Sequence, residues 1–210
     1  MNRIYAATAG VLIAAMLGVT VYFAFWARPD DPLRGCGGAS VAGGLGSIGG
    51  SFTLVDEHGR TVTDKDVITG PTLVYFGYTF CPDVCPLDSA RNAAVLELLE
   101  KRGIRASLVM ISVDPERDTP EVMAEFTDLF HPRMIGLTGT PAQVKAAAQA
   151  YKAYYARQPG DDDYYLVDHS TFTYLVLPGR GVVDLFRRDE TPEEMADRIA
   201  CVLDALGGGV

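Results

Sequence analysis

The sequence predicts an α/β domain preceded by a single transmembrane helix. From about residue 72 onward, segments rich in β-branched and aromatic residues alternate with segments of helical periodicity. This alternation ends in a hairpin and a last helix, an order that fits an α/β sandwich. Cys81 and Cys85 fall where an early central strand meets a helix. A dithiol at such a corner narrows the α/β class to a thioredoxin-like fold.

The N-terminal segment from Ile4 to Trp26 contains no charged residue over 23 positions. As a helix it would be about 34 Å long, which is enough to cross a bilayer. We expect an uncleaved anchor rather than a signal peptide, because no site of small residues follows the apolar run closely. Arg3 precedes the run and Arg28 and Arg34 follow it, so the positive charges do not decide its orientation.

The chain is predicted to have three parts. Residues 1–34 form the membrane anchor, residues 35–50 a flexible, glycine-rich tether, and residues 51–210 the thioredoxin-like domain. The whole chain carries a net charge of −9, and residues 1–34 carry +1, so the remainder carries −10. A strongly acidic domain without a basic cluster is a poor nucleic-acid binder, and we expect no nucleic-acid partner.

Within the domain, turn and cap signals separate the expected elements. Thr119-Pro120, Thr140-Pro141 and Thr191-Pro192 each place a capping threonine before a proline at the first helical position. The expected elements, in chain order, are a hairpin over 52–63 with its turn at His58-Gly59, a strand from 73, a helix from Pro86 to about 102, a strand over 106–113, a helix over 119–130, a short strand at 135–138, a helix over 140–155, a hairpin over 171–186 and a helix from 191 to about 206.

The corner that holds the two cysteines is a reactive dithiol. Pro86 has no backbone N–H, so we expect the helix to begin near it, with residues 81–85 as a compact turn at its mouth. Unpaired N–H groups of the first helical turn would then face the sulfurs and favour thiolate over thiol. One turn of chain places the two Cα atoms about 6 Å apart, which suits either a disulfide or one soft metal ion. The spacing alone therefore leaves redox chemistry and metal binding open.

A third ligand would distinguish the two, and the chain has three histidines. His58 belongs to the exposed hairpin turn, and His131 precedes a proline at a helix end, where a capping role is expected. His169 lies between two strand-like runs, in a loop at a sheet edge, and in thioredoxin-like folds the equivalent loop faces the dithiol. The alternative for His169 is a hydrogen-bonded loop histidine with no ligand role.

Six sequence blocks resemble the Sco/SenC family of membrane-anchored, thioredoxin-fold copper proteins that assist cytochrome oxidase assembly. They occur in family order between about Gly49 and Leu206. The blocks are Leu73-Val-Tyr-Phe-Gly-Tyr-Thr, Cys81-Pro-Asp-Val-Cys-Pro, Ile111-Ser-Val-Asp-Pro-Glu-Arg-Asp-Thr-Pro, Phe130-His-Pro-Arg, Gly136-Leu-Thr-Gly-Thr and Val167-Asp-His-Ser.

The resemblance implies that Cys81, Cys85 and His169 bind copper. Two thiolates and one imidazole suit Cu(I) and, with a further weak ligand, can hold Cu(II). Asp168 is a candidate for orienting the imidazole from outside the ligand set. Asp114 corresponds to an acidic residue that the family keeps near its site; a simple turn or helix cap is an equal alternative for it.

We expect a metallochaperone rather than an enzyme. It would deliver copper to the dinuclear copper centre of a terminal oxidase subunit, its main partner beside other periplasmic copper chaperones or thiol reductants. The alternative is a thiol–disulfide oxidoreductase whose redox-active pair, Cys81 and Cys85, reduces the oxidase copper-site cysteines or senses redox state. The resemblance also implies a single-pass protein of the bacterial inner membrane, with its globular domain in the periplasm.

Two further cysteines are extra to the family pattern. We interpret Cys36 as an incidental thiol of the tether. Cys201 lies beside the apolar stripe of the last helix, formed by Ile199, Val202 and Leu203, and is also interpreted as incidental. The alternative is a disulfide between the two, since an exported protein can form one and a flexible tether can reach.

Overall fold

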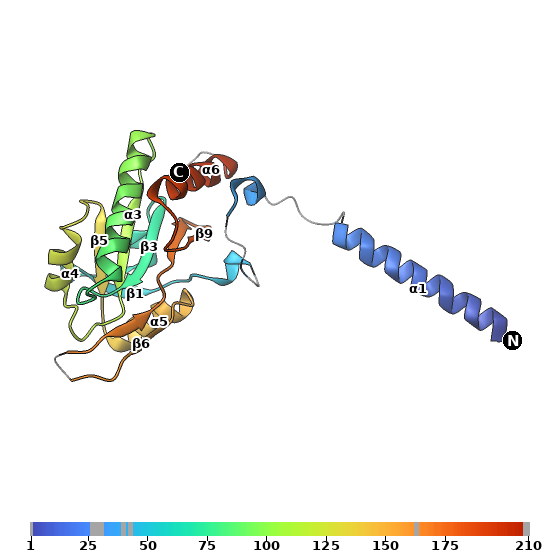
Figure 1. Ribbon diagram of the computed structural model, residues 1–210, viewed down its shortest axis with the longest axis horizontal. Coiled ribbons are helices and arrows are strands. Elements are labelled where there is room, and N and C mark those ends of the chain that lie inside the picture. The colour runs from blue at the N-terminus through green and yellow to red at the C-terminus, as the bar shows by residue number, and fades with distance from the viewer. Residues whose placement is uncertain (1, 26–31, 39–40, 42–43, 162–163, 208–210) are drawn as a thin grey trace.

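The computed structural model describes residues 2–25, 32–38, 41, 44–161 and 164–207. In this part of the chain, helices lie on both faces of a seven-stranded mixed sheet, and one N-terminal helix stands apart from the rest (Figure 1). The α/β, thioredoxin-like class that the sequence predicts is confirmed.

The elements predicted from the sequence occur in the expected order, with several short elements in addition. Together, the elements are α1 (Asn2–Phe25), the 3-10 helices η1 (Pro32–Cys36) and η2 (Leu45–Ser47), β1 (Thr53–Asp56), β2 (Thr61–Thr63), α2 (Asp64–Val67), β3 (Thr72–Gly77), α3 (Val84–Lys101), β4 (Ser107–Ser112), α4 (Pro120–Thr127), β5 (Met134–Thr138), α5 (Pro141–Ala150), β6 (Tyr155–Arg157), β7 (Val167–His169), β8 (Thr173–Leu177), β9 (Gly181–Phe186) and α6 (Pro192–Ala205).

The large sheet has the strand order β2-β1-β5-β4-β3-β8-β9. Its centre is parallel, since β3 pairs with β4 and β4 pairs with β5 in the same direction. The hairpin of β8 and β9 is antiparallel and joins the free side of β3. A separate two-stranded sheet of β6 and β7 carries His169. Strand β3 is therefore central, and its carboxyl end leads directly into the two cysteines.

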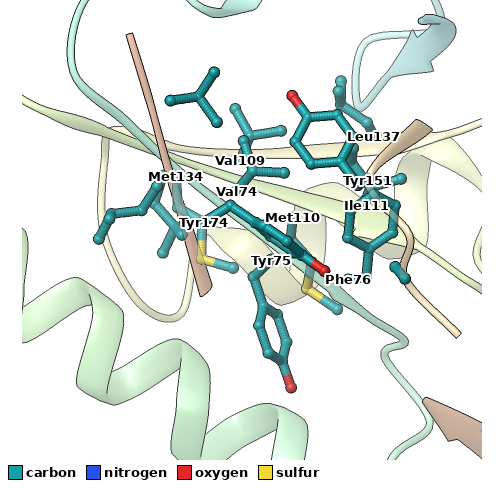
Figure 2. Packing of buried hydrophobic residues seen from close by; sticks show 14 of the residues in the cluster. Val74, Tyr75, Phe76, Val109, Met110, Ile111, Met134, Leu137, Tyr151 and Tyr174 are labelled. Carbon is teal, nitrogen blue, oxygen red and sulfur yellow. The ribbon is translucent and has the colours of Figure 1, made fainter. Parts of the chain in front are cut away.

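Successive side chains of β3 point to opposite faces of the sheet. Phe76 packs with Tyr151 and Tyr174 on one face, with ring centroids 5.5 and 6.1 Å away. Tyr75 points to the other face, where its hydroxyl lies against Asp88 of α3. Figure 2 shows the Tyr75 ring extending away from the side of the sheet that holds Tyr151. The central strand is thus buried on both faces, as its uninterrupted apolar run predicts.

The helix starts that the sequence predicts are confirmed at three positions. Thr119, Thr140 and Thr191 each accept a hydrogen bond from a backbone N–H of the first turn, and each is followed by proline at the first helical position. The dithiol helix α3 begins at Val84, two residues before Pro86. The proline is tolerated inside the first turn because the N–H it lacks has no partner there.

Two parts of the prediction are corrected. The helix expected over 140–155 ends at Ala150, and Tyr155–Arg157 forms strand β6 instead. His169, expected in a loop, is the last residue of β7, where it pairs with Tyr155. Short strands of three residues carry too little alternation to be recognised from sequence.

The segment that precedes the domain also differs from expectation. In the described residues, none of the helices combines the length and apolar character needed to cross a membrane, so this finding does not support the anchor expected within residues 1–34. Residues 1 and 26–31 of that anchor, and 39–40 and 42–43 of the tether, lie outside the described residues.

The tether expected over 35–50 is attached to the domain. Cys36 forms a disulfide with Cys201 of α6, so the interpretation of both cysteines as incidental thiols is wrong. Ile48 is buried, and the N–H of Gly49 donates to the carbonyl of Ala150. These contacts fix both ends of a segment that its glycine content alone marks as flexible.

Candidate metal centre

The two free cysteines lie on the corner between β3 and α3. Gly77, the last residue of β3, makes room for Cys85: a Cβ at this position would lie 3.0 Å from Cys85 Sγ and 2.7 Å from the Tyr75 ring. The next turn is held by Asp118, whose buried carboxylate accepts hydrogen bonds from the backbone N–H and the hydroxyl of Thr79. The backbone that leads from β3 to Cys81 is therefore held in place by close packing at Gly77 and by hydrogen bonds at Thr79.

The sulfur of Cys81 serves as the acceptor that a capping side chain would otherwise provide. Asp83 is the residue before the first turn of α3, but its side chain makes no capping hydrogen bond. The N–H of Cys85 points instead at Cys81 Sγ, at 3.5 Å. The expectation that free N–H groups of the first turn would face a sulfur is confirmed, and such a donor stabilises a thiolate.

Cys85 is enclosed and faces several polar groups. Its side chain is fully buried, whereas Cys81 remains 7% exposed. Cys85 Sγ lies 3.5 Å from the N–H of Tyr78, 3.8 Å from the hydroxyl of Tyr75 and 3.3 Å from Nε2 of His169. The sulfur of Cys81 is thus the more accessible of the two.

His169 reaches the dithiol from the small sheet. Its ring stands edge-on to Tyr75 and Tyr78, with centroids 6.1 and 5.7 Å away. The hydroxyl of Tyr78 also accepts the N–H of Val167 and so ties β7 to the corner. His169 Nδ1 lies 3.0 Å from the carbonyl oxygen of Ser170. Because a carbonyl can only accept, Nδ1 carries a proton. Nε2 faces the sulfurs, to which it donates when the imidazole is protonated and offers a lone pair when the imidazole is neutral.

The side chains of Cys81, Cys85 and His169 form a group that could hold a metal ion. Their three ligand atoms lie within 4.8 Å of one another. Sulfur and nitrogen ligands at about 2.0–2.3 Å from a common ion lie no more than about 4.6 Å apart. Only a small closure of the group is needed, and the ligand set of two sulfurs and one imidazole suits a soft ion such as copper.

The two thiols differ in acidity. The hydrogen bond from Cys85, together with those from His169 and the backbone, lowers the pKa of Cys81 to about 3 against the opposing effect of burial. The same interaction with Cys81, followed by burial, raises the pKa of Cys85. Burial lowers the pKa of His169, but hydrogen bonds to Cys81 and to the Ser170 carbonyl outweigh it and leave that pKa raised. Without a metal, Cys81 is the thiolate and Cys85 the thiol that donates to it.

The two predicted supporting carboxylates lie elsewhere. Asp168 is exposed and accepts a hydrogen bond from the side-chain amide of Gln158, so the hypothesis that it orients the imidazole is wrong; the Ser170 carbonyl does so. Asp114 is buried, but its carboxylate is engaged by the Tyr165 hydroxyl and by Arg117, each at 2.6 Å. Its role is to hold the turn after β4 rather than to touch a ligand.

The other histidines are separate from this group, as expected. His58 lies in the hairpin turn, where its N–H donates to Asp56. His131 is buried and its Nδ1 accepts the N–H of Arg133.

Three side chains that touch the site were not predicted from the sequence. Tyr75 and Tyr78 lie in the apolar run that leads to the corner, and no role at the site was predicted for them. Asp88 follows Cys85 by three positions, the spacing that places two residues on one face of a helix. That spacing could have indicated from the sequence that Asp88 lies on the same helix face as Cys85. In the structure its buried carboxylate accepts a hydrogen bond from the Tyr75 hydroxyl.

Comparisons with known proteins agree with this geometry. The family model described as SCO1/SenC matches residues 42–204. Protein SenC of Rhodobacter capsulatus is 53% identical over 206 residues, which cover 96% of this chain and 90% of that protein. The crystal structure of Arabidopsis thaliana ScoI with copper bound is 38% identical, with a TM-score of 0.72 over 75% of this chain and 98% of that one. The structure of Bradyrhizobium japonicum ScoI with copper bound is 40% identical, with a TM-score of 0.66 over 73% and 98% of the two chains.

The match covers most of the chain, includes the corner, and relates it to structures that contain copper. This chain belongs to the SCO1/SenC family.

Proposed function

We propose that this protein is a copper metallochaperone that carries one copper ion on Cys81, Cys85 and His169. It delivers that ion to the dinuclear copper centre of a terminal cytochrome oxidase subunit. The observation that carries the proposal is the convergence of the three ligand atoms within 4.8 Å, from two elements separated by more than eighty residues.

The protonation pattern supports metal loading. Cys81 is a thiolate before any metal arrives, and a metal binds the thiolate form of cysteine. His169 presents Nε2 while its other nitrogen donates to a backbone carbonyl, the arrangement that orients histidine ligands in metal sites. Cys85 has to release its proton on coordination, so copper binding releases protons into solution.

Delivery to an oxidase rests on the family. The SCO1/SenC family is associated with cytochrome c oxidase assembly, and relatives with 38% and 40% identity have been solved with copper bound. The greater exposure of Cys81 makes it the first ligand that an acceptor protein can reach.

A thiol–disulfide oxidoreductase is the second candidate function. It is favoured by the asymmetry of the dithiol: an accessible thiolate at Cys81 beside a buried thiol at Cys85 is the arrangement of an attacking and a resolving cysteine. The imidazole of His169 distinguishes the two functions, since a disulfide between the cysteines does not need it.

Copper titration of the reduced protein tests the site. We expect one tightly bound copper in the wild type and a loss of affinity of at least about 100-fold in Cys81→Ser and in Cys85→Ser, more than the loss of a supporting hydrogen bond costs. The matched control is His58→Ala, which removes an exposed turn histidine and should leave affinity unchanged. Wild-type affinity in either cysteine variant would exclude this site.

Placement of the domain in the periplasm, with residues 4–26 as a single-pass anchor, belongs to the same proposal. The disulfide between Cys36 and Cys201 favours an oxidising compartment. The anchor is supported by the 23 uncharged positions and by apolar side chains of α1 that are more than half exposed, such as Leu12 and Met16. Against it stands the finding that α1, as described, is not long and apolar enough to cross a membrane. Alkylation of thiols in intact cells, followed by mass measurement of the protein, tests both points. Free thiols at Cys36 and Cys201 would contradict export to an oxidising compartment. A mature protein that lacks the N-terminal residues would contradict the uncleaved anchor.

A further inference from the structure

Behind Cys85, a buried tyrosine and a buried carboxylate form a chain of contacts. The hydroxyl of Tyr75 lies 3.8 Å from Cys85 Sγ and 3.0 Å from Asp88 Oδ2. Tyr75 is fully buried and Asp88 is 2% exposed. The second carboxylate oxygen of Asp88 accepts from Nε of Arg188, at 3.3 Å. Cys85 is thus linked through two side chains to an arginine that is partly in solvent.

A tyrosine hydroxyl has one proton and two candidate acceptors here. Asp88 is closer than the sulfur, and hydrogen bonds to a carboxylate are about twice as strong as those between neutral groups. A tyrosine hydroxyl ordinarily has a pKa of about 10, so it keeps its proton at neutral pH. Both contacts have the geometry of a hydrogen bond from the Tyr75 hydroxyl, but one proton cannot serve both fully, and we expect it to lie toward Asp88, the nearer and stronger acceptor, rather than toward Cys85.

The carboxylate is held in place for this role. Asp88 follows Cys85 by three residues on α3, so the helix fixes the two side chains relative to each other. Both of its oxygens accept hydrogen bonds, one from Tyr75 and one from Arg188. These two hydrogen bonds orient the carboxylate toward the Tyr75 hydroxyl.

A hydrogen bond to a coordinated thiolate withdraws electron density from the sulfur, and such bonds are one of the levers by which a protein adjusts a metal–sulfur site. From these contacts we infer that Asp88 is a positioning residue for copper. By accepting the Tyr75 proton, it keeps that hydroxyl from donating to Cys85 and so preserves the donor strength of the buried sulfur. The inference rests on the proposed function for the identity of the metal ion. The effect of Asp88 on the Cys85 sulfur can also be measured without copper.

The test compares Asp88→Asn, Tyr75→Phe and the double variant. The first readout is the energy of the sulfur-to-copper charge-transfer absorption after addition of Cu(II). A neutral amide competes less well for the Tyr75 proton, so in Asp88→Asn we expect the band to move to higher energy and copper affinity to fall about tenfold. In Tyr75→Phe the band should stay at its wild-type energy, and the double variant should match Tyr75→Phe.

The second readout is the midpoint potential of the metal-free Cys81–Cys85 couple, which gains two electrons and one proton on reduction at neutral pH, because Cys81 stays a thiolate and Cys85 becomes a thiol. A new hydrogen bond to Cys85 stabilises the reduced form, so Asp88→Asn should raise this potential and the double variant should not. A wild-type protein that binds no copper would defeat the proposed function, while this potential would still test the role of Asp88.

Arg188→Gln covers the case in which Asp88→Asn does not fold. Arg188 is partly exposed, and its loss weakens the hold on Asp88, so the band and the potential should shift in the same direction by a smaller amount. The matched control is Arg187→Gln, an exposed neighbour paired with Asp189, which should shift neither. An unchanged band and potential in both Asp88→Asn and Arg188→Gln would overturn the inference. So would a shift that persists in the double variant, because the carboxylate would then not act through Tyr75.

Discussion

The two pairs of cysteines in this chain have opposite fates. Cys81 and Cys85 are four residues apart, reduced, and directed at an imidazole. Cys36 and Cys201 are 165 residues apart and joined in a disulfide with Cα atoms 5.6 Å from each other. The chemistry of the thiol is the same in each pair, so the surrounding structure accounts for the difference.

The surroundings differ in the donors that they offer to sulfur. The first pair lies at the N-terminus of α3, where backbone N–H groups are free and one of them points at Cys81. Cys201 lies inside α6, where the backbone N–H groups are engaged in the hydrogen bonds of the helix. The short helix η1 packs against α6 and brings Cys36 next to Cys201. The first environment stabilises a thiolate that can bind a metal; the second only brings two side chains together. One pair is therefore reactive and the other structural.

The largest effect on stability is expected at the structural pair. The double substitution Cys36→Ser with Cys201→Ser releases a loop of 165 residues, and we expect the free energy of unfolding to fall by about 2–5 kcal/mol. Denaturant unfolding measures this, and copper affinity should not change. An unfolding free energy equal to wild type, or a loss of copper binding, would remove the distinction between a structural and a reactive pair.

The two pairs also differ in their response to pH, because only the reactive pair contains thiols that titrate. The folded pKa of Cys81, about 3, is far below its ordinary value of 9.0, so its thiolate contributes stability above pH 9 that is lost progressively as pH falls toward 3. Cys85, whose pKa is raised, should remain a thiol under the same conditions.

Ultraviolet absorbance of the thiolate follows this titration in the metal-free protein. We expect one thiolate from pH 8 down to pH 4, and its loss in Cys81→Ser. The bridged pair contains no titrating thiol and serves as the internal control. A wild-type signal that disappears between pH 9 and pH 7 would contradict the assignment of Cys81 as a preformed thiolate.

The same contrast explains what could be predicted from sequence. The Cys81–Cys85 corner is local, because strand, turn and helix signals lie within thirty residues, and its fold context was predicted correctly. The contact of His169 with the dithiol is long-range, yet the strand order of a thioredoxin-like fold restricts where that segment can lie. The Cys36–Cys201 disulfide requires the segment before the domain to pack against the last helix, and no local sequence pattern predicts that long-range contact.

The details around the imidazole were beyond the sequence for a related reason. Asp168 adjoins His169, but side chains of neighbouring strand residues point to opposite faces, so a residue next to a ligand is poorly placed to support it. The supporting group is the carbonyl of Ser170, and a backbone atom leaves no trace in residue type. Tyr75 and Asp88 were missed because a buried strand tyrosine and a helix aspartate each have a commoner structural explanation.

The most direct test of the central claim is His169→Ala, assayed for copper in the oxidase of cells that carry the variant and for the redox potential of the purified protein. A chaperone that loses one of three ligands should retain copper at least about 10–100-fold less well and leave the oxidase short of copper. The Cys81–Cys85 disulfide should still form, with only a modest change in potential. Normal copper in the oxidase of the variant strain would contradict the chaperone account and favour the oxidoreductase.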